Sequence, residues 1–84
     1  MSPLAHLINE AQSLKEVDLK QSYSIAKELA YINVNILWYP EKMSEHIARL
    51  RSLADHVKLT FKGQGTDLVA AIKQTALSLK TIDN

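Results

Sequence analysis

The scarcity of residues that interrupt helices most constrains how this chain can fold. Its 84 residues include only two glycines and two prolines. A β-sheet domain needs such turn residues about every ten positions, because each strand must reverse into the next. Long helices need far fewer. The sequence therefore predicts an all-α fold, and since a chain of this length supplies enough apolar material for one core, we expect a single helical domain over residues 1–84.

Four stretches of the chain carry apolar residues at alternating separations of three and four positions. That spacing places the apolar residues on one side of an α-helix. The stretches predict four helices, over about residues 3–15, 19–39, 41–62 and 67–82. Short connections make successive helices antiparallel neighbours, so we expect a small up-down-up-down four-helix bundle.

The predicted core consists of the apolar stripe of each helix. The stripes comprise Leu4, Leu7, Ala11 and Leu14; Ile25, Leu29, Ile32, Ile36 and Tyr39; Met43, Ile47, Leu50, Ala54, Val57 and Phe61; and Leu68, Ile72, Thr75, Leu79 and Ile82. Leu59 faces away from the third stripe and is expected to be exposed, as isolated surface leucines often are.

Most helix boundaries have an identifiable cause in the sequence. Pro40 ends the second helix, because the residue before a proline is pushed out of the α region. Gly63 is expected to take the left-handed conformation after the third helix. Thr66 or Asp67 caps the fourth helix, and Asp18 is a candidate cap for the second. The connection between the first two helices contains no glycine or proline, so one long helix is an alternative there.

The segment YINVNILWYP, residues 31–40, contains three of the five aromatic residues and no charged residue before Pro40. On a helical wheel at about 100° per residue, Tyr31, Val34 and Trp38 lie roughly opposite the core stripe. Three interpretations are open. The helix is central and buried on both sides; or the Tyr31, Val34 and Trp38 face is exposed and binds a second copy or another protein; or the segment is a β-strand, because branched residues alternate with asparagine.

Five cationic residues of the third predicted helix are candidate contacts to nucleic acid or another anion: Lys42, Arg49, Arg51, Lys58 and Lys62. The alternative is a solvated surface on which Glu45 and Arg49 form an i,i+4 pair. Residues 22–39 also resemble a degenerate helix-turn-helix. An uninterrupted helix is the alternative, because Ala30 replaces the usual glycine of the turn and the second helix would begin without arginine or lysine.

No pattern in the sequence indicates an enzyme, a metal site or a cofactor. The chain has no cysteine, which excludes a thiolate nucleophile and a cysteine-based zinc site. His6, His46 and His56 are not spaced to share a metal ion, and we expect them at the surface. No glycine-rich phosphate loop follows a strand, and the carboxylates lie among cations. We therefore expect no catalysis, no metal, no cofactor and no small-molecule substrate.

The overall charge and hydropathy indicate an ordinary cytoplasmic protein. The net charge of +1 is too small to indicate a nucleic-acid or membrane binder by itself. The longest uncharged stretch is about half the ~20 residues that a membrane-spanning helix needs. The absence of cysteine suits a reducing compartment.

No motif identifies a family. The general form, a small bundle with weakly basic helices, is similar to bacteriocin immunity proteins, small antitoxins and phage-encoded inhibitors, which is an analogy at the level of the fold. We therefore predict a non-catalytic protein–protein interaction module that binds a protein partner or a second copy through an apolar face of its second helix. The alternative is a small nucleic-acid-binding regulator that uses the basic third helix or the helix-turn-helix pattern.

Overall fold

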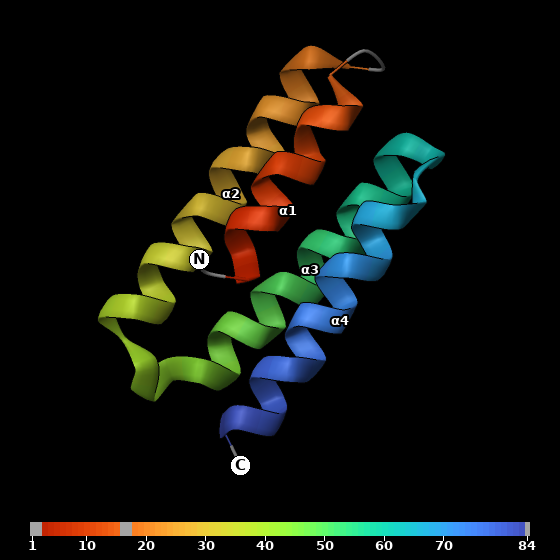
Figure 1. The fold of residues 1–84 in the computed structure, drawn as a ribbon. Helices are drawn as coiled ribbons and strands as arrows, with labels where there is room; N and C mark the ends of the chain where they lie inside the picture. The colour runs from red at the N-terminus through yellow and green to blue at the C-terminus, as the bar shows by residue number, and fades with distance from the viewer. Residues whose placement is uncertain (1–2, 16–17, 84) are drawn as a thin grey trace.

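The computed structural model describes residues 3–15 and 18–83, which form four α-helices joined by short connections (Figure 1). The helices are α1 (Pro3–Ala11), α2 (Leu19–Trp38), α3 (Met43–Phe61) and α4 (Thr66–Asp83). The connections include two 3-10 turns and one extended segment: η1 (Gln12–Leu14), η2 (Pro40–Lys42) and β1 (Lys62–Gly65). The predicted all-α, four-helix fold is confirmed.

The helices are arranged as two hairpins, α1 with α2 and α3 with α4, that lie side by side (Figure 1). Figure 1 shows the chain reversing direction at each connection. The most extensive packing is within the hairpins, and contacts of α2 with α3 and of α1 with α4 join one hairpin to the other. The result is an elongated molecule with extents of 37 × 19 × 19 Å.

The core is one cluster to which all four helices contribute. Every residue of the first and third predicted stripes is buried, from Leu4 to Leu14 and from Met43 to Phe61. Leu53, Ala76 and His46 are also buried, although none belongs to a predicted stripe. Helix α3 packs against both α2 and α4, so its buried sector is wider than a single stripe and takes in Leu53 and His46.

Two residues of the predicted core are exposed instead. Tyr39 is the C-cap of α2, with φ −131° and ψ 61°, and has already left the helix, so its side chain no longer follows the stripe. Ile82 lies in the last turn of α4, where the neighbouring helices leave it uncovered. Ile36 and Thr75 are half-buried. Leu59 is exposed, as predicted.

The first two helices are separate and packed against each other, so the alternative of one long helix is wrong. Asp18 has an extended backbone, and its Oδ1 accepts a hydrogen bond of 3.1 Å from the Gln21 backbone N–H, which confirms it as the N-cap of α2. The buried hydroxyl of Ser22 donates to the Ala11 carbonyl at 2.7 Å. This bond fixes the end of α1 against the first turns of α2.

Pro40 ends α2, as predicted, but the third helix begins later than expected. Pro40 opens the 3-10 turn η2, and α3 starts only at Met43. The Nε2 of His46 lies 2.8 Å from the Tyr39 carbonyl, and since a carbonyl only accepts, the imidazole donates. His46 is therefore a buried structural residue that holds the α2–α3 corner, which corrects the expectation of a surface histidine.

The α3–α4 connection has two successive residues with positive φ. Lys62 is the left-handed C-cap of α3, with φ 43° and ψ 60°, and its N–H donates to the Lys58 carbonyl. Gly63 follows with φ 95°, as predicted. Gly65 also has positive φ, and a Cβ atom there would lie 3.0 Å from Leu14 Cδ2, so the segment packs closely against η1. Since the described residues contain no second strand, β1 is a connection and not part of a sheet.

Candidate functional site

Helix α2 presents two apolar faces. The inner face, Ser22, Ile25, Leu29 and Ile32, is buried in the core. On a helical wheel drawn at about 100° per residue, nine residues fall side by side within a sector of about 120° on the other side of the helix. We call this sector the outer face; it comprises Leu19, Lys20, Tyr23, Lys27, Ala30, Tyr31, Val34, Leu37 and Trp38. Apart from the two lysines, every residue in it is apolar or aromatic.

All nine residues of the outer face are exposed. Trp38 is 74% exposed and Leu37 70%, while Tyr31 and Val34 are 51% and 50% exposed. A helix packed on both sides would not have such exposed residues, so the interpretation of α2 as a central helix buried on both sides is wrong. Burial in the chain's own core does not explain why this face is apolar. Exposure is what the partner-binding interpretation of Tyr31, Val34 and Trp38 requires, and binding itself stays a prediction.

The distribution of aromatic residues is equally one-sided. All three tyrosines and the tryptophan are exposed and lie between Tyr23 and Tyr39, whereas Phe61 is in the core. Helix α2 is continuous from Leu19 to Trp38, so the β-strand interpretation is wrong. The same continuity leaves no turn at Ala30, and residues 22–39 therefore lack the two-helix geometry of a helix-turn-helix.

The charges on α2 are arranged unevenly. Lys20 and Lys27 are the charged residues of the outer face, and the Lys27 ammonium lies 5.6 Å from the centre of the Tyr23 ring. Glu28 is the single acidic residue of α2, and it lies outside this face, toward α3. Its Oε1 is 3.6 Å from Nε of Arg49. The outer face is thus cationic without a compensating carboxylate of its own.

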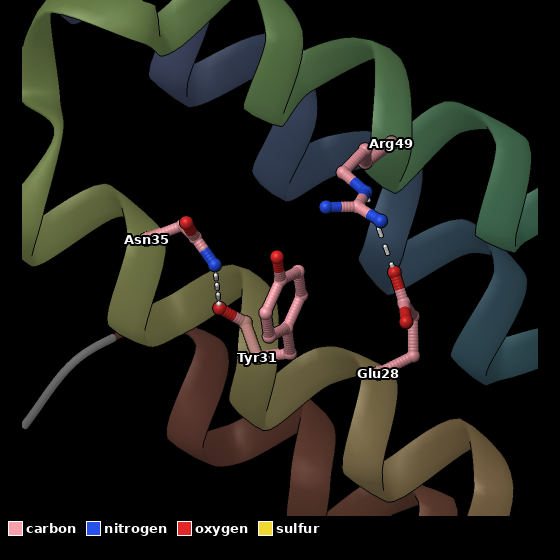
Figure 2. Close-up of polar contacts among 4 residues, drawn as sticks. All are labelled: Glu28, Tyr31, Asn35 and Arg49. Atoms are coloured by element: carbon pink, nitrogen blue, oxygen red, sulfur yellow. Dashed lines mark hydrogen bonds and ion pairs between the residues drawn. The ribbon is translucent and has the colours of Figure 1, made fainter.

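Figure 2 shows the edge at which the outer face meets α3. Glu28 and Tyr31 project from α2 toward Arg49, whose guanidinium lies 4.8 Å from the centre of the Tyr31 ring. One turn further along α2, the Asn35 side-chain amide donates to the Tyr31 carbonyl at 2.8 Å. Among the described residues, Arg49 forms its ion pair with Glu28 and not with the predicted Glu45, because the α2–α3 contact brings Glu28 within reach.

A polar hollow of about 340 Å³ lies at the corner where α2, η2 and α3 meet. The Lys42 ammonium stands 5.5 Å from the centre of the Tyr39 ring at this corner. The lining residues are Tyr31, Asn35, Tyr39, Lys42, Glu45, His46 and Arg49. Two of the five predicted cationic residues, Lys42 and Arg49, therefore belong to the same corner as the end of the outer face.

The remaining predicted cations lie away from this corner: Arg51 and Lys58 on the other flank of α3, and Lys62 in the connection β1. Arg51 lines a hollow of about 450 Å³ together with Asp55 and Lys73. Lys58 and Lys73 line a second hollow, beside the connection that contains Lys62. The five cations predicted to contact nucleic acid are thus divided between two sides of α3 and do not form one continuous basic face.

The described residues form neither a metal site nor a membrane-spanning helix. Within residues 3–15 and 18–83, no group of three or more histidine, cysteine, aspartate or glutamate residues is placed to bind a metal ion. None of the helices in that part of the chain combines the length and apolar character needed to cross a bilayer. Comparison with protein-family models, curated proteins and solved structures finds no match to this chain.

Only three residues of the outer face, Tyr31, Val34 and Trp38, are predicted from the sequence. Leu37 and the residues that extend the face toward the start of α2 are not. Positions 20, 23, 27, 30, 34 and 37 repeat the three-and-four spacing of a second stripe. That spacing is visible in the sequence. Two of its positions are lysines, however, so a pattern of apolar residues alone does not include them.

Proposed function

We propose that this protein is a non-catalytic protein–protein interaction module, acting as an inhibitor, immunity factor or adaptor, and that it binds its partner through the outer face of α2. The observation that carries the proposal is the make-up of that face, in which seven of nine exposed residues are apolar or aromatic. A continuous exposed apolar surface on a small protein typically marks an interaction site. The lack of cysteine supports a cytoplasmic setting.

The aromatic content of the outer face supports the same function. Tyrosine and tryptophan bury a large rigid area when a partner covers them, and they lose little conformational freedom in doing so. The Arg49 guanidinium lies over the Tyr31 ring and the Lys27 ammonium over the Tyr23 ring, and each contact favours one orientation of its tyrosine. A surface whose large side chains are positioned in advance binds with a smaller entropic cost.

The nucleic-acid alternative stays a prediction with weaker support. It relies on the cations on and beside α3, which lie on two different sides of the helix. A protein that tracks a phosphate backbone usually presents its cations as one patch or stripe.

Photo-crosslinking in the native host cell tests the proposed function. A photoreactive amino acid replaces Leu37, or in a matched control Leu59, which is also exposed but stands alone on α3. We expect a discrete protein adduct from the Leu37 position and none from the Leu59 position. Equal adducts from both positions, or none from Leu37, would contradict the proposal.

A Trp38→Ala variant separates binding from folding. Because Trp38 is mostly exposed, its replacement should change the free energy of unfolding by less than about 0.5 kcal/mol while weakening formation of the Leu37 adduct. Chemical denaturation measures the first quantity, and the yield of the adduct measures the second. A loss of several kcal/mol with an unchanged adduct would show that Trp38 serves the core instead.

A further inference from the structure

We propose that the segment which docks on the outer face is an amphipathic helix with a row of carboxylates along one flank of its apolar stripe. This inference rests on the proposed function and adds the chemical nature of the partner. It is carried by the spacing of the apolar residues on α2 and by the sign and position of the charges beside them.

The spacing on α2 fits a helix rather than an extended peptide or a flat surface. Residues 20, 23, 27, 30, 34 and 37 recur at separations of three and four, which is the pattern of a seam between two packed helices. Helix α2 is 20 residues long, so the seam extends for about 30 Å at 1.5 Å per residue. Ala30 stands near the middle, where a small residue allows a second helix to approach closely.

The two edges of the outer face differ in chemistry. Leu19, Ala30 and Leu37 form the edge away from α3 and carry no charge. Lys20 and Lys27 lie toward the other edge, which Tyr31 and Arg49 continue at the contact with α3 (Figure 2). The Arg49 side chain remains half exposed although it pairs with Glu28. The partner's carboxylates are therefore expected on the flank that faces α3.

A second copy of this chain is a poor occupant of the same face. A two-fold contact brings identical surfaces together. Two copies of the outer face would bring together Lys20 and Lys27 of each chain and no carboxylate of the face. Like charges in a contact of low dielectric repel, so the face favours a different, acidic chain.

Single-stranded nucleic acid is also a poorer fit. Bases stack on aromatic rings, and the outer face has three of these. Its aliphatic residues, Leu19, Val34 and Leu37, offer nothing for stacking and are suited instead to the apolar side chains of a helix. The net charge of +1 on the whole chain gives a polyanion little general attraction.

A peptide-display selection on the full chain tests the inference. The library consists of amphipathic helices of about 20 residues, long enough to hold a helix on docking. Leucine and phenylalanine are fixed in one stripe, and the positions on each flank vary among glutamate, glutamine and lysine. Parallel selections use Val34→Glu, which places a repelling carboxylate on the face, and a Lys58→Gln/Lys73→Gln double variant as a matched control.

We expect glutamate to be enriched along one flank only, and the selected peptide to bind about tenfold more tightly than its glutamine counterpart. Added salt should weaken the glutamate peptide and leave the glutamine peptide nearly unchanged. A Lys20→Gln/Lys27→Gln double variant should remove the preference for glutamate while keeping the glutamine peptide's affinity. The Lys58→Gln/Lys73→Gln variant should behave as the native protein does.

The outcomes distinguish this inference from the function on which it rests. Enrichment of apolar helices without preference for glutamate overturns the acidic partner and leaves docking on the outer face intact. If the peptides bind the Val34→Glu variant and the native protein with equal affinity, they dock elsewhere. That result overturns both the inference and the proposed function. Failure to enrich any helix, or tighter binding of a thymidine oligonucleotide at the same face, overturns the inference.

Discussion

The two faces of α2 have similar apolar character, but one is buried and the other is exposed. On the inner face, Ile25, Leu29 and Ile32 are buried against the other helices. On the outer face, Val34, Leu37 and Trp38 meet solvent. Both sets follow the three-and-four spacing of packed helices. A single helix can therefore carry one stripe for its own fold and a second that its own fold does not use.

The difference between the faces lies in which elements surround them. Helices α1 and α3 both pack against α2, and they cover the inner face between them. No helix within residues 3–15 and 18–83 covers the opposite side of α2 (Figure 1). Apolar spacing alone identifies a stripe that can pack, and the number of available partner helices decides whether it does.

The largest effect is expected from truncating the inner face. Leu29→Ala should lower the free energy of unfolding by about 2–5 kcal/mol, because the side chain is fully buried and the truncation leaves a cavity. Leu37→Ala, the same change in the same helix on the outer face, should alter it by less than about 0.5 kcal/mol. Urea denaturation of both variants measures the difference. Comparable losses in the two variants would mean that the two faces are not distinct.

An intermediate effect is expected from the polar contact on the inner face. Ser22→Ala removes the hydroxyl that donates to the Ala11 carbonyl and leaves that acceptor without its 2.7 Å partner. We expect a loss of about 1–2 kcal/mol, because the bond is buried. Ser24→Ala serves as a matched control on the exposed surface and should have almost no effect. Thermal denaturation followed by circular dichroism would show the contrast, and equal midpoints would refute it.

The smallest effect is expected at the boundary between the faces. The side chains of Arg49 and Glu28 are 50% and 38% exposed, so water screens their pairing and it contributes little. A double-mutant cycle with Arg49→Ala and Glu28→Ala should give a coupling energy below about 1 kcal/mol that declines further with salt. A coupling of several kcal/mol, independent of salt, would place this pair inside the core and move the boundary of the outer face.

The fold could be predicted largely because the third stripe is regular. From Met43 to Phe61 the apolar residues follow one another at separations of three and four without interruption, and all six predicted residues are buried. Tyr39 fits the spacing of the second stripe equally well and is exposed, because the helix ends one residue before it. A periodic pattern does not show where a helix terminates unless a residue such as Pro40 forces it, and then only to within a residue or two.

Contacts between helices were beyond the sequence interpretation. The hydrogen bonds of Ser22 and His46 depend on which helices pack together and on how far each is shifted along its axis relative to the other. The partner of Arg49 illustrates this point, since Glu45 is nearby in sequence and Glu28 is nearby in space. Local spacing identified Tyr31, Val34 and Trp38 as candidates, but their exposure depends on where α1 and α3 pack against α2, and the spacing of residues along α2 does not predict that.

The position of Trp38 has a practical consequence for experiments on this protein. It is the chain's one tryptophan, and its indole is already largely in water in the folded state. Unfolding therefore changes its surroundings little, and its emission will be a poor measure of folding. Any chain that covers the end of α2 will move the indole into apolar surroundings and shift its emission to shorter wavelength. The folded protein thus carries an optical reporter for occupancy of its surface that is nearly independent of the state of its core.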